Sequence, residues 1–184
     1  FPSEFKNDVR EVTLEGEGYF EVHSDKQHPF VVHSDDISVT ATGTKFNVNT
    51  YTSTASVALL EGKVGVEVGK SSTSLAPGQI LKRTGEDISV EEADIELFCG
   101  WKDGIVSFRD DSMEYVLERL GQIYGVEFEI MDPAICDYLY RGTFKGKPLE
   151  QILGVIEMSI PVRFTDHGFG SDQNLRHIIV GMEE

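Results

Sequence analysis

The tripeptide Gly69-Lys70-Ser71 has the residue types that close a phosphate-binding loop. Such a loop needs four residues between its two glycines, because successive backbone N–H groups must surround the phosphates. Only three residues separate Gly65 from Gly69, and the surrounding pattern predicts a β-hairpin. Gly16-Glu17-Gly18 is half of a dinucleotide-binding fingerprint, but its position between predicted strands favours turn glycines. We therefore expect no nucleotide site.

Three histidines, His23, His28 and His33, form the one histidine cluster of the sequence. If the strand Gly18–His23 formed a hairpin with the next strand, His23 and His28 would face each other across its turn. Two such imidazoles could begin a zinc or copper site. The odd spacing from His28 to His33 places those two on opposite faces of a strand, so no third ligand is apparent. We expect solvated hairpin ends, with no metal and no cofactor.

Catalytic motifs are missing from the sequence. It contains neither a GxSxG nor an HExxH motif, and Cys99 and Cys136 lie in no CxxC pair. The carboxylates Asp110–Asp111 and Glu91–Glu92 are explained by helix capping and by a solvated linker. We therefore predict that the chain is not an enzyme. Whether Cys99 and Cys136 form a disulfide stays open.

Aromatic side chains recur along one predicted strand. Tyr138, Tyr140 and Phe144 alternate on one face together with Gly142. Phe144 fits a core position, whereas Tyr138 and Tyr140 lie nearer the start of the strand and are expected to be more exposed. With the neighbouring Arg141, these two tyrosines are our candidate partner-binding residues.

The charge of the chain restricts its partners. Among 184 residues there are 32 acidic and 16 basic side chains, which gives a formal net charge of −16. This charge repels phosphate backbones and anionic lipids, so we expect neither nucleic acid nor membrane surfaces as partners. Apolar runs such as Val57–Leu60 are far shorter than the roughly 20 residues that cross a bilayer. Because no leader is visible at Phe1, we expect the chain to be part of a longer protein.

The first half of the chain shows the period of β-strands. Short runs rich in Val, Thr, Phe and Tyr alternate between Val9 and Val90, and Gly, Asp, Ser or Pro separate them. The predicted strands are Glu11–Leu14, Gly18–His23, Phe30–His33, Ile37–Ala41, Lys45–Tyr51, Ser56–Glu61, Val64–Val68, Gln79–Lys82 and Ile88–Val90. They predict an all-β N-terminal domain, residues 1–95, built as a sandwich, roll or solenoid.

After Trp101 the apolar period becomes helical. One helix carries the apolar face Met113, Val116, Leu117 and Leu120, with Asp111 and Glu114 as a capping pair and Gly125 as its end. A second helix begins with Pro148 in its first turn and carries Leu149, Ile152, Leu153 and Ile156. These segments predict a small α+β domain over residues 101–184.

The two helical segments also resemble each other. A shift of 36 positions aligns apolar and charged positions through a strand, a helix and the next strand: Phe108 with Phe144, Arg109 with Lys145, Met113 with Leu149, Glu114 with Glu150, Leu117 with Leu153, Val126 with Val162, and Phe128 with Phe164. The second domain is therefore predicted to consist of two duplicated βαβ units, completed by a strand at His177–Val180.

Several stretches resemble a known family. The segments Glu17–Val22, His28–Val32 and Thr42–Val48 are similar to the pattern G-x-(Y/F)-F-x-V, P-F-x-V and G-T-x-F-x-V of FecR-like proteins. The resemblance continues through Leu59–Val64 and Leu75–Gln79. In the second half, Trp101–Gly104 with Phe108, the helix up to Tyr124, Tyr140–Phe144 and the helix Leu149–Ile156 resemble the C-terminal domain of this family. That domain is similar to the secretin/TonB short N-terminal fold.

The resemblance implies a role in signalling across the cell envelope. FecR-like proteins are single-pass inner-membrane anti-sigma regulators whose periplasmic part receives a signal. The signal comes from the signalling domain of a TonB-dependent outer-membrane receptor, and it reaches an extracytoplasmic-function sigma factor. Binding of the sigma factor requires a cytoplasmic segment that is absent from this sequence.

Open sheet edges provide a physical means for such binding, because an edge can accept a partner's strand through main-chain hydrogen bonds. We expect the receptor domain to bind mainly to the C-terminal domain. The alternative is a glycan- or peptidoglycan-binding β module that uses aromatic residues such as Tyr19, Phe46 and Tyr51.

Overall fold

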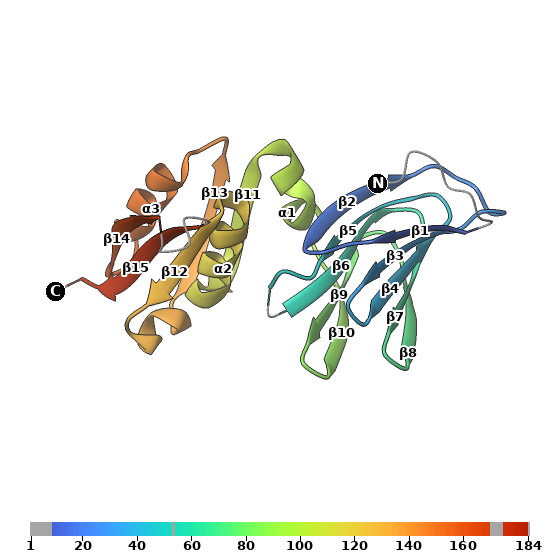
Figure 1. The fold of residues 1–184 in the computed structure, drawn as a ribbon, viewed down its shortest axis with the longest axis horizontal. Helices are drawn as coiled ribbons and strands as arrows, with labels where there is room; N and C mark the ends of the chain where they lie inside the picture. Colours follow the sequence, from blue (N-terminus) through green and yellow to red (C-terminus); the bar gives the residue numbers. More distant parts are fainter. Residues whose placement is uncertain (1–8, 53, 170–174, 184) are drawn as a thin grey trace. The chain divides into compact units, whose positions relative to one another are not determined.

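The computed structural model describes residues 9–52, 54–169 and 175–183 (Figure 1). Phe1, at which the sequence shows no leader, lies outside the described residues. The chain divides into two compact units, residues 1–102 and 103–184. Among the described residues the secondary structure is mainly β and forms several sheets, as the sequence predicted.

The N-terminal unit contains two five-stranded sheets. The first has the order β1-β3-β4-β7-β8 and the second the order β10-β9-β6-β5-β2. Pairing is antiparallel except between β1 and β3. The strands are β1 (Arg10–Thr13), β2 (Glu17–Val22), β3 (Phe30–Ser34), β4 (Ile37–Ala41), β5 (Thr44–Asn49), β6 (Thr54–Glu61), β7 (Val64–Val68), β8 (Ser71–Leu75), β9 (Gln79–Thr84) and β10 (Asp87–Glu92).

The core of this unit is built from the alternating apolar positions of both sheets. Val32, Val39, Val57 and Leu59 are fully buried, and the ring of Phe46 stacks on that of Phe20 at a centroid distance of 5.2 Å. Burying each large apolar side chain of this kind contributes roughly 1.5–3 kcal/mol to folding. The period of two that predicted the strands therefore also identifies the residues that hold the sheets together.

Glu91 and Glu92, which were explained by a solvated linker, are the last residues of β10 and pair with β9, and the segment after them is not a linker either. It forms a short helix, α1 (Glu96–Cys99), and a 3-10 turn, η1 (Gly100–Asp103). Ile95 and Cys99 are buried against Ala58 and Ile80, so the segment closes a small apolar cluster on the N-terminal unit. The prediction of a linker was wrong because buried apolar residues lie between the exposed acidic ones.

The C-terminal unit contains two small sheets and two long helices. One sheet pairs β11 with β13, and the other has the order β12-β15-β14. Residues from both sheets and both helices share one apolar core. The elements are β11 (Ile105–Ser112), α2 (Met113–Tyr124), β12 (Val126–Ile130), η2 (Pro133–Asp137), β13 (Leu139–Lys145), α3 (Leu149–Glu157), β14 (Val162–Phe169) and β15 (Arg176–Met182).

The order of elements follows the internal similarity of the sequence. The segment β11-α2-β12 is followed by β13-α3-β14, and helix α3 begins 36 positions after α2. Phe108 and Phe144 are both buried in the core, as their alignment predicted. The last strand, β15, lies between β12 and β14 and completes the three-stranded sheet.

The ends of the helices depend on particular residues. Helix α2 is capped by Ser112, whose side chain accepts a hydrogen bond from the backbone N–H of Tyr115, and not by Asp111 as predicted. Asp111 instead accepts the backbone N–H of Arg109 at 2.8 Å. Gly125 ends the helix with left-handed backbone angles, which agrees with the sequence. Pro148 lies at the N-cap of α3, one position before the first turn.

Candidate partner-binding face

The two-stranded sheet β11–β13 has two chemically different faces. Its inner face carries Val106, Phe108, Tyr140 and Phe144, which are buried in the core of the C-terminal unit. The residues between them point to the other side, which we call the outer face. The outer face consists of Ile105, Ser107, Arg109, Leu139, Arg141, Thr143 and Lys145.

Tyr140 is not exposed as the sequence analysis expected. Its side chain is only 4% exposed and packs between the rings of Phe108 and Phe144, at centroid distances of 6.2 and 6.4 Å. Gly142 makes room for this ring, since a Cβ atom there would lie 3.0 Å from it. The tyrosine shares a strand face with Phe144, and helix packing buries that whole face. Tyr140 is thus a core residue that packs β13 against the rest of the C-terminal unit.

Tyr138 and Leu139 lie where the chain enters β13. Tyr138 is half-buried, its N–H donates to the carbonyl of Ile135, and its carbonyl accepts the N–H of Met113. Leu139 is 64% exposed on the outer face, which is unusual for a large apolar residue in a strand. The sequence analysis did not identify Leu139. Its position one residue from Tyr140 on the opposite strand face was the available signal.

Arg141 is exposed on the outer face, and Asp110 is its partner. The Nε atom of Arg141 donates to Oδ1 of Asp110 at 3.1 Å, and an Nη2 contact makes the pair bidentate. Asp110 lies in a β-bulge with left-handed backbone (φ 57°), which turns its carboxylate toward β13. The hydrogen bond from Arg141 lowers the pKa of Asp110 below its ordinary value.

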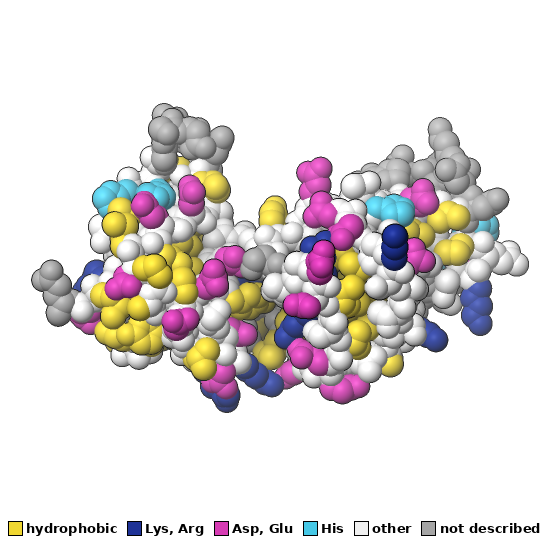
Figure 2. All heavy atoms as spheres, turned by 90° about the horizontal axis from the view of Figure 1, so that it is seen from below, with side chains coloured by type: hydrophobic (Ala, Val, Ile, Leu, Met, Phe, Trp, Pro, Cys, Tyr) yellow, Lys and Arg dark blue, Asp and Glu magenta, His cyan; other side chains and the backbone are white. Residues whose placement is uncertain are grey.

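The outer face is basic in an acidic chain. Three of the seven Lys and Arg residues between positions 103 and 184 lie on it, namely Arg109, Arg141 and Lys145. On the face that Figure 2 shows, Asp and Glu side chains are widely spread, while Lys and Arg side chains occur in a few places. Arg109 is directly opposite Arg141 in the ladder.

One edge of β13 is open. Gly146 donates its N–H to the carbonyl of Gly104 at 2.8 Å, which fixes the alternation of bonded pairs along the ladder. It follows that the main-chain groups of Arg141, Thr143 and Lys145 point away from β11. No strand pairs with this edge within the part of the chain that the structure describes.

The hairpin that would have brought His23 and His28 together does not form. Strands β2 and β3 belong to different sheets, so His23 and His28 do not face each other across a hairpin. His28 bonds Asp25 at 2.8 Å, and His33 bonds Ser38 at 2.9 Å. In residues 9–52, 54–169 and 175–183, no group of three or more His, Cys, Asp or Glu side chains is placed to hold a metal ion.

Gly69 and Lys70 form the turn between β7 and β8, in agreement with the predicted hairpin. Cys99 is buried in the N-terminal unit and Cys136 is half-buried in the C-terminal unit, and both thiols are free. Burial, and secondarily the charge of Glu17, raises the pKa of Cys99 to about 12. The two cysteines therefore do not form the disulfide that the sequence left open.

The residues proposed for glycan binding do not form a platform. Phe46 is fully buried, Tyr51 is 62% exposed, and the ring of Tyr19 lies under the ammonium of Lys102 at 5.0 Å. An open pocket of about 380 Å³ lies near the end of β2, and none of these aromatic residues lines it. Its lining residues are Glu21, Val22, His23, Ser24, Gly43, Thr44, Lys45 and Glu61.

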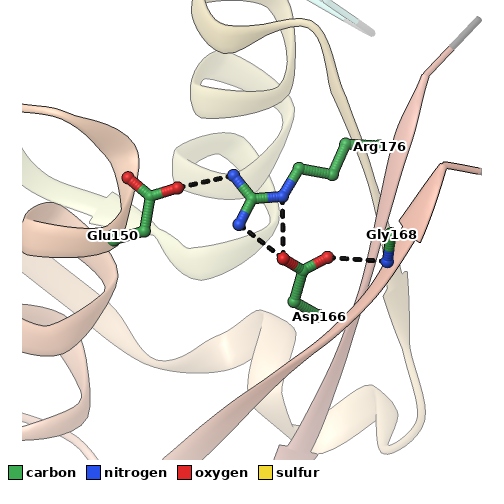
Figure 3. Close-up of polar contacts among 4 residues, drawn as sticks. All are labelled: Glu150, Asp166, Gly168 and Arg176. Atoms are coloured by element: carbon green, nitrogen blue, oxygen red, sulfur yellow. Dashed lines mark hydrogen bonds and ion pairs between the residues drawn. The ribbon is translucent and has the colours of Figure 1, made fainter.

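A second ion-pair cluster links α3 to the β14–β15 pair (Figure 3). Arg176 donates to Glu150 at 2.6 Å and to Asp166 at 2.5 and 2.9 Å, and Asp166 also accepts the N–H of Gly168 at 2.8 Å. The hydrogen bonds from Arg176 lower the pKa values of both carboxyl groups. Because both acids and the base are satisfied within the cluster, it holds the unit together and offers little to a partner.

No helix in the described ranges is both long and apolar enough to cross a membrane.

Two family models match the chain in order. The model described as "FecR protein" matches residues 2–65, and that described as "FecR, C-terminal" matches residues 105–170. Together they cover more than two thirds of the chain.

Two solved structures are similar over the whole chain. Both are crystal structures of a "putative anti-sigma factor" from Parabacteroides distasonis ATCC 8503, at 1.65 and 2.50 Å resolution. The chain is 26% identical to each, with TM-scores of 0.86 and 0.84, and the matches cover 100% of this chain and 85% of the other. No match was found among curated proteins.

Proposed function

Because this chain belongs to the FecR family of anti-sigma factors, we propose that it is the periplasmic, signal-receiving part of a membrane-anchored regulator. Its partner is the signalling domain of a TonB-dependent outer-membrane receptor. Binding of that domain reports nutrient status, which the rest of the regulator relays to an extracytoplasmic-function sigma factor. The observation that carries the proposal is the ordered match of both family models, supported by a similar structure over the full chain.

The C-terminal unit is the proposed binding unit. Its outer face combines an open strand edge, an exposed Leu139 and a local excess of positive charge at Arg141 and Lys145. An open edge supplies main-chain hydrogen bonds, and side chains beside it supply specificity. A standard interface buries about 800 Å² on each partner, an area that a unit of this size can provide.

Co-purification tests the proposal. The full chain is mixed with the signalling domain of the receptor encoded beside its gene, and an unrelated receptor's signalling domain is the control. We expect a complex with the first domain and none with the second. A fragment of residues 1–102 that bound as tightly as the full chain would refute the assignment to the C-terminal unit.

Glycan binding is the less supported function, because Phe46 is buried and the open pocket near β2 contains none of the proposed aromatic residues. A glycan array with the full chain separates the two functions.

A further inference from the structure

Basic side chains lie beside the open edge of β13. We infer that the receptor's signalling domain docks by adding an extended acidic segment to this edge, along Leu139, Arg141 and Lys145; the inference rests on the proposed function. The added segment pairs with the main chain of β13 and places its carboxylates on the basic outer face.

The main chain of β13 is suited to a further strand. The groups of Arg141, Thr143 and Lys145 point to the free side and, among the described residues, meet no neighbouring strand. The free edge of β11 is different, since Asp111 already accepts the N–H of Arg109 there. The register of the sheet thus leaves β13 the better template of the two strands.

The side chains beside that edge select for negative charge. A residue whose main chain points to the free edge of β13 also has its side chain on the outer face, so Arg141 and Lys145 border any added strand. An added carboxylate at this position would lie beside Arg141, which faces Arg109 in the ladder. A partner segment with positive charges would be repelled by Arg141 and Lys145.

Leu139 offers an apolar contact at the start of β13, on the same outer face as Arg141 and Lys145. Its side chain is 64% exposed, although it is a large apolar residue at a strand position. A partner strand with an apolar residue at the matching position would cover it. The expected recognition element therefore has an apolar residue beside Leu139 and carboxylates beside Arg141 and Lys145.

Three of the other edge strands, β8, β10 and β12, have a different character. Strand β10 carries the acidic residues Asp87, Glu91 and Glu92, and β8 carries the neutral run Ser71–Ser74 before Leu75. On β12 the exposed side chains are Glu127 and Glu129. An acidic segment would be repelled by β10 and β12 and would gain no charge contact on β8, which favours β13 over these three strands.

Charge-reversal variants of the full chain test this inference. The probe is the signalling domain of the neighbouring receptor, and its affinity is measured by calorimetry at low and high salt. Arg141→Glu and Lys145→Glu should each weaken binding about tenfold at low salt, and the loss should shrink as salt increases. Lys70→Glu makes the same change of charge at the β7–β8 turn and should leave the affinity unchanged.

Asp110→Asn should have the opposite effect. It removes the carboxylate that pairs with Arg141, and asparagine tolerates the left-handed backbone of Asp110. We expect binding to become severalfold tighter. Lys145→Glu disturbs no ion pair of the described structure, so it stays informative if Arg141→Glu unfolds locally; circular dichroism and a thermal melt identify such unfolding.

The outcomes separate the two proposals. If the unaltered chain binds and neither reversal weakens it, the inference about β13 fails while the proposed function stands. If the unaltered chain does not bind the receptor domain, both fail. If sedimentation shows self-association that Lys145→Glu abolishes, the occupant of the edge is a second copy and the inference is overturned.

Discussion

Arg141 and Asp110 show how an exposed ion pair can serve recognition without contributing much to folding. Both side chains are largely exposed, and exposed pairs of this kind contribute little to stability. Their charges are nevertheless held in fixed places by the bulge in β11 and the register with β13. Breaking this ion pair to form contacts with a partner therefore costs little free energy.

The two cysteines should differ in reactivity. The thiolate is the reactive form, and burial raises the pKa of Cys99 to about 12, whereas Cys136 is only partly buried. In the native protein at pH 8, Ellman's reagent should modify Cys136 well before Cys99. Equal rates under native conditions would contradict the buried position of Cys99. In denaturant the two rates should become equal.

At the residue level Arg141, a candidate partner-binding residue, is exposed, whereas the burial of Tyr140 was not predicted. Alternation along a strand establishes that Tyr140, Gly142 and Phe144 share a face, but it does not say how far helices cover that face. Because Phe144 was already assigned to the core, the same assignment for Tyr140 was within reach. Asp110 was explained as a capping residue. Its pairing with Arg141 depends on a β-bulge that no local sequence pattern predicts.

Two glycines in the helices should respond oppositely to alanine. Gly125 ends α2 with left-handed angles (φ 65°), where a Cβ atom costs about 1–2 kcal/mol. Gly154 lies inside α3, and a Cβ atom there meets nothing within 4 Å, so alanine should stabilise by about 0.5–1 kcal/mol. Urea titrations of Gly125→Ala and Gly154→Ala measure both changes. Changes of the same sign would contradict these helix boundaries.

The cluster at Arg176 should stabilise the C-terminal unit in a pH-dependent way. Since Arg176 lowers the folded-state pKa values of Glu150 and Asp166, its contribution is present above their unfolded-state pKa values near 4. It is lost as the pH falls through the lowered values. Arg176→Gln should therefore reduce the free energy of unfolding at neutral pH, with a difference that disappears in acid.

Arg163→Gln, which removes a more exposed cation of β14 together with its ion pair to Glu183, is the comparison for this change and should have the smaller effect. Urea titrations at several pH values measure the difference between each variant and the unaltered chain. A difference for Arg176→Gln that did not depend on pH would show that the ion pairs are not its source.

At the level of elements, strands with apolar alternation were predicted one by one, whereas the polar β8 was indicated only by the hairpin predicted around Gly69. β8 contains Ser71, Ser72, Thr73 and Ser74 before its one buried residue, Leu75, so it has no hydrophobic period. It forms because its main chain pairs with β7. The helix α1 was missed for a related reason, since its four residues are too few to show a helical period.

The two units are compact, and we expect them to unfold separately. Leu120 is fully buried in the C-terminal unit and Leu59 in the N-terminal unit. Truncation of either to alanine should cost about 2 to 5 kcal/mol. In calorimetry of the full chain, Leu120→Ala should lower one transition and Leu59→Ala the other. Transitions that shifted together in both variants would indicate a single cooperative unit.

At the level of the whole chain, the order of motifs was informative where single motifs were not. Glu17–Val22, Thr42–Val48 and Leu75–Gln79 are each short, but their succession resembled one family, to which both family models also assign the chain. The identity of the receptor could not be predicted, because recognition depends on side chains beside a strand edge. These are surface positions that the folding pattern does not restrict.

Hydrogen exchange with and without the receptor's signalling domain tests the central claim most directly. Measured on the full chain, binding should slow exchange of backbone amides in Leu139–Lys145, whose outward-facing N–H groups would enter hydrogen bonds with the partner. Protection confined to residues 9–102, or none at saturating receptor domain, would contradict the account.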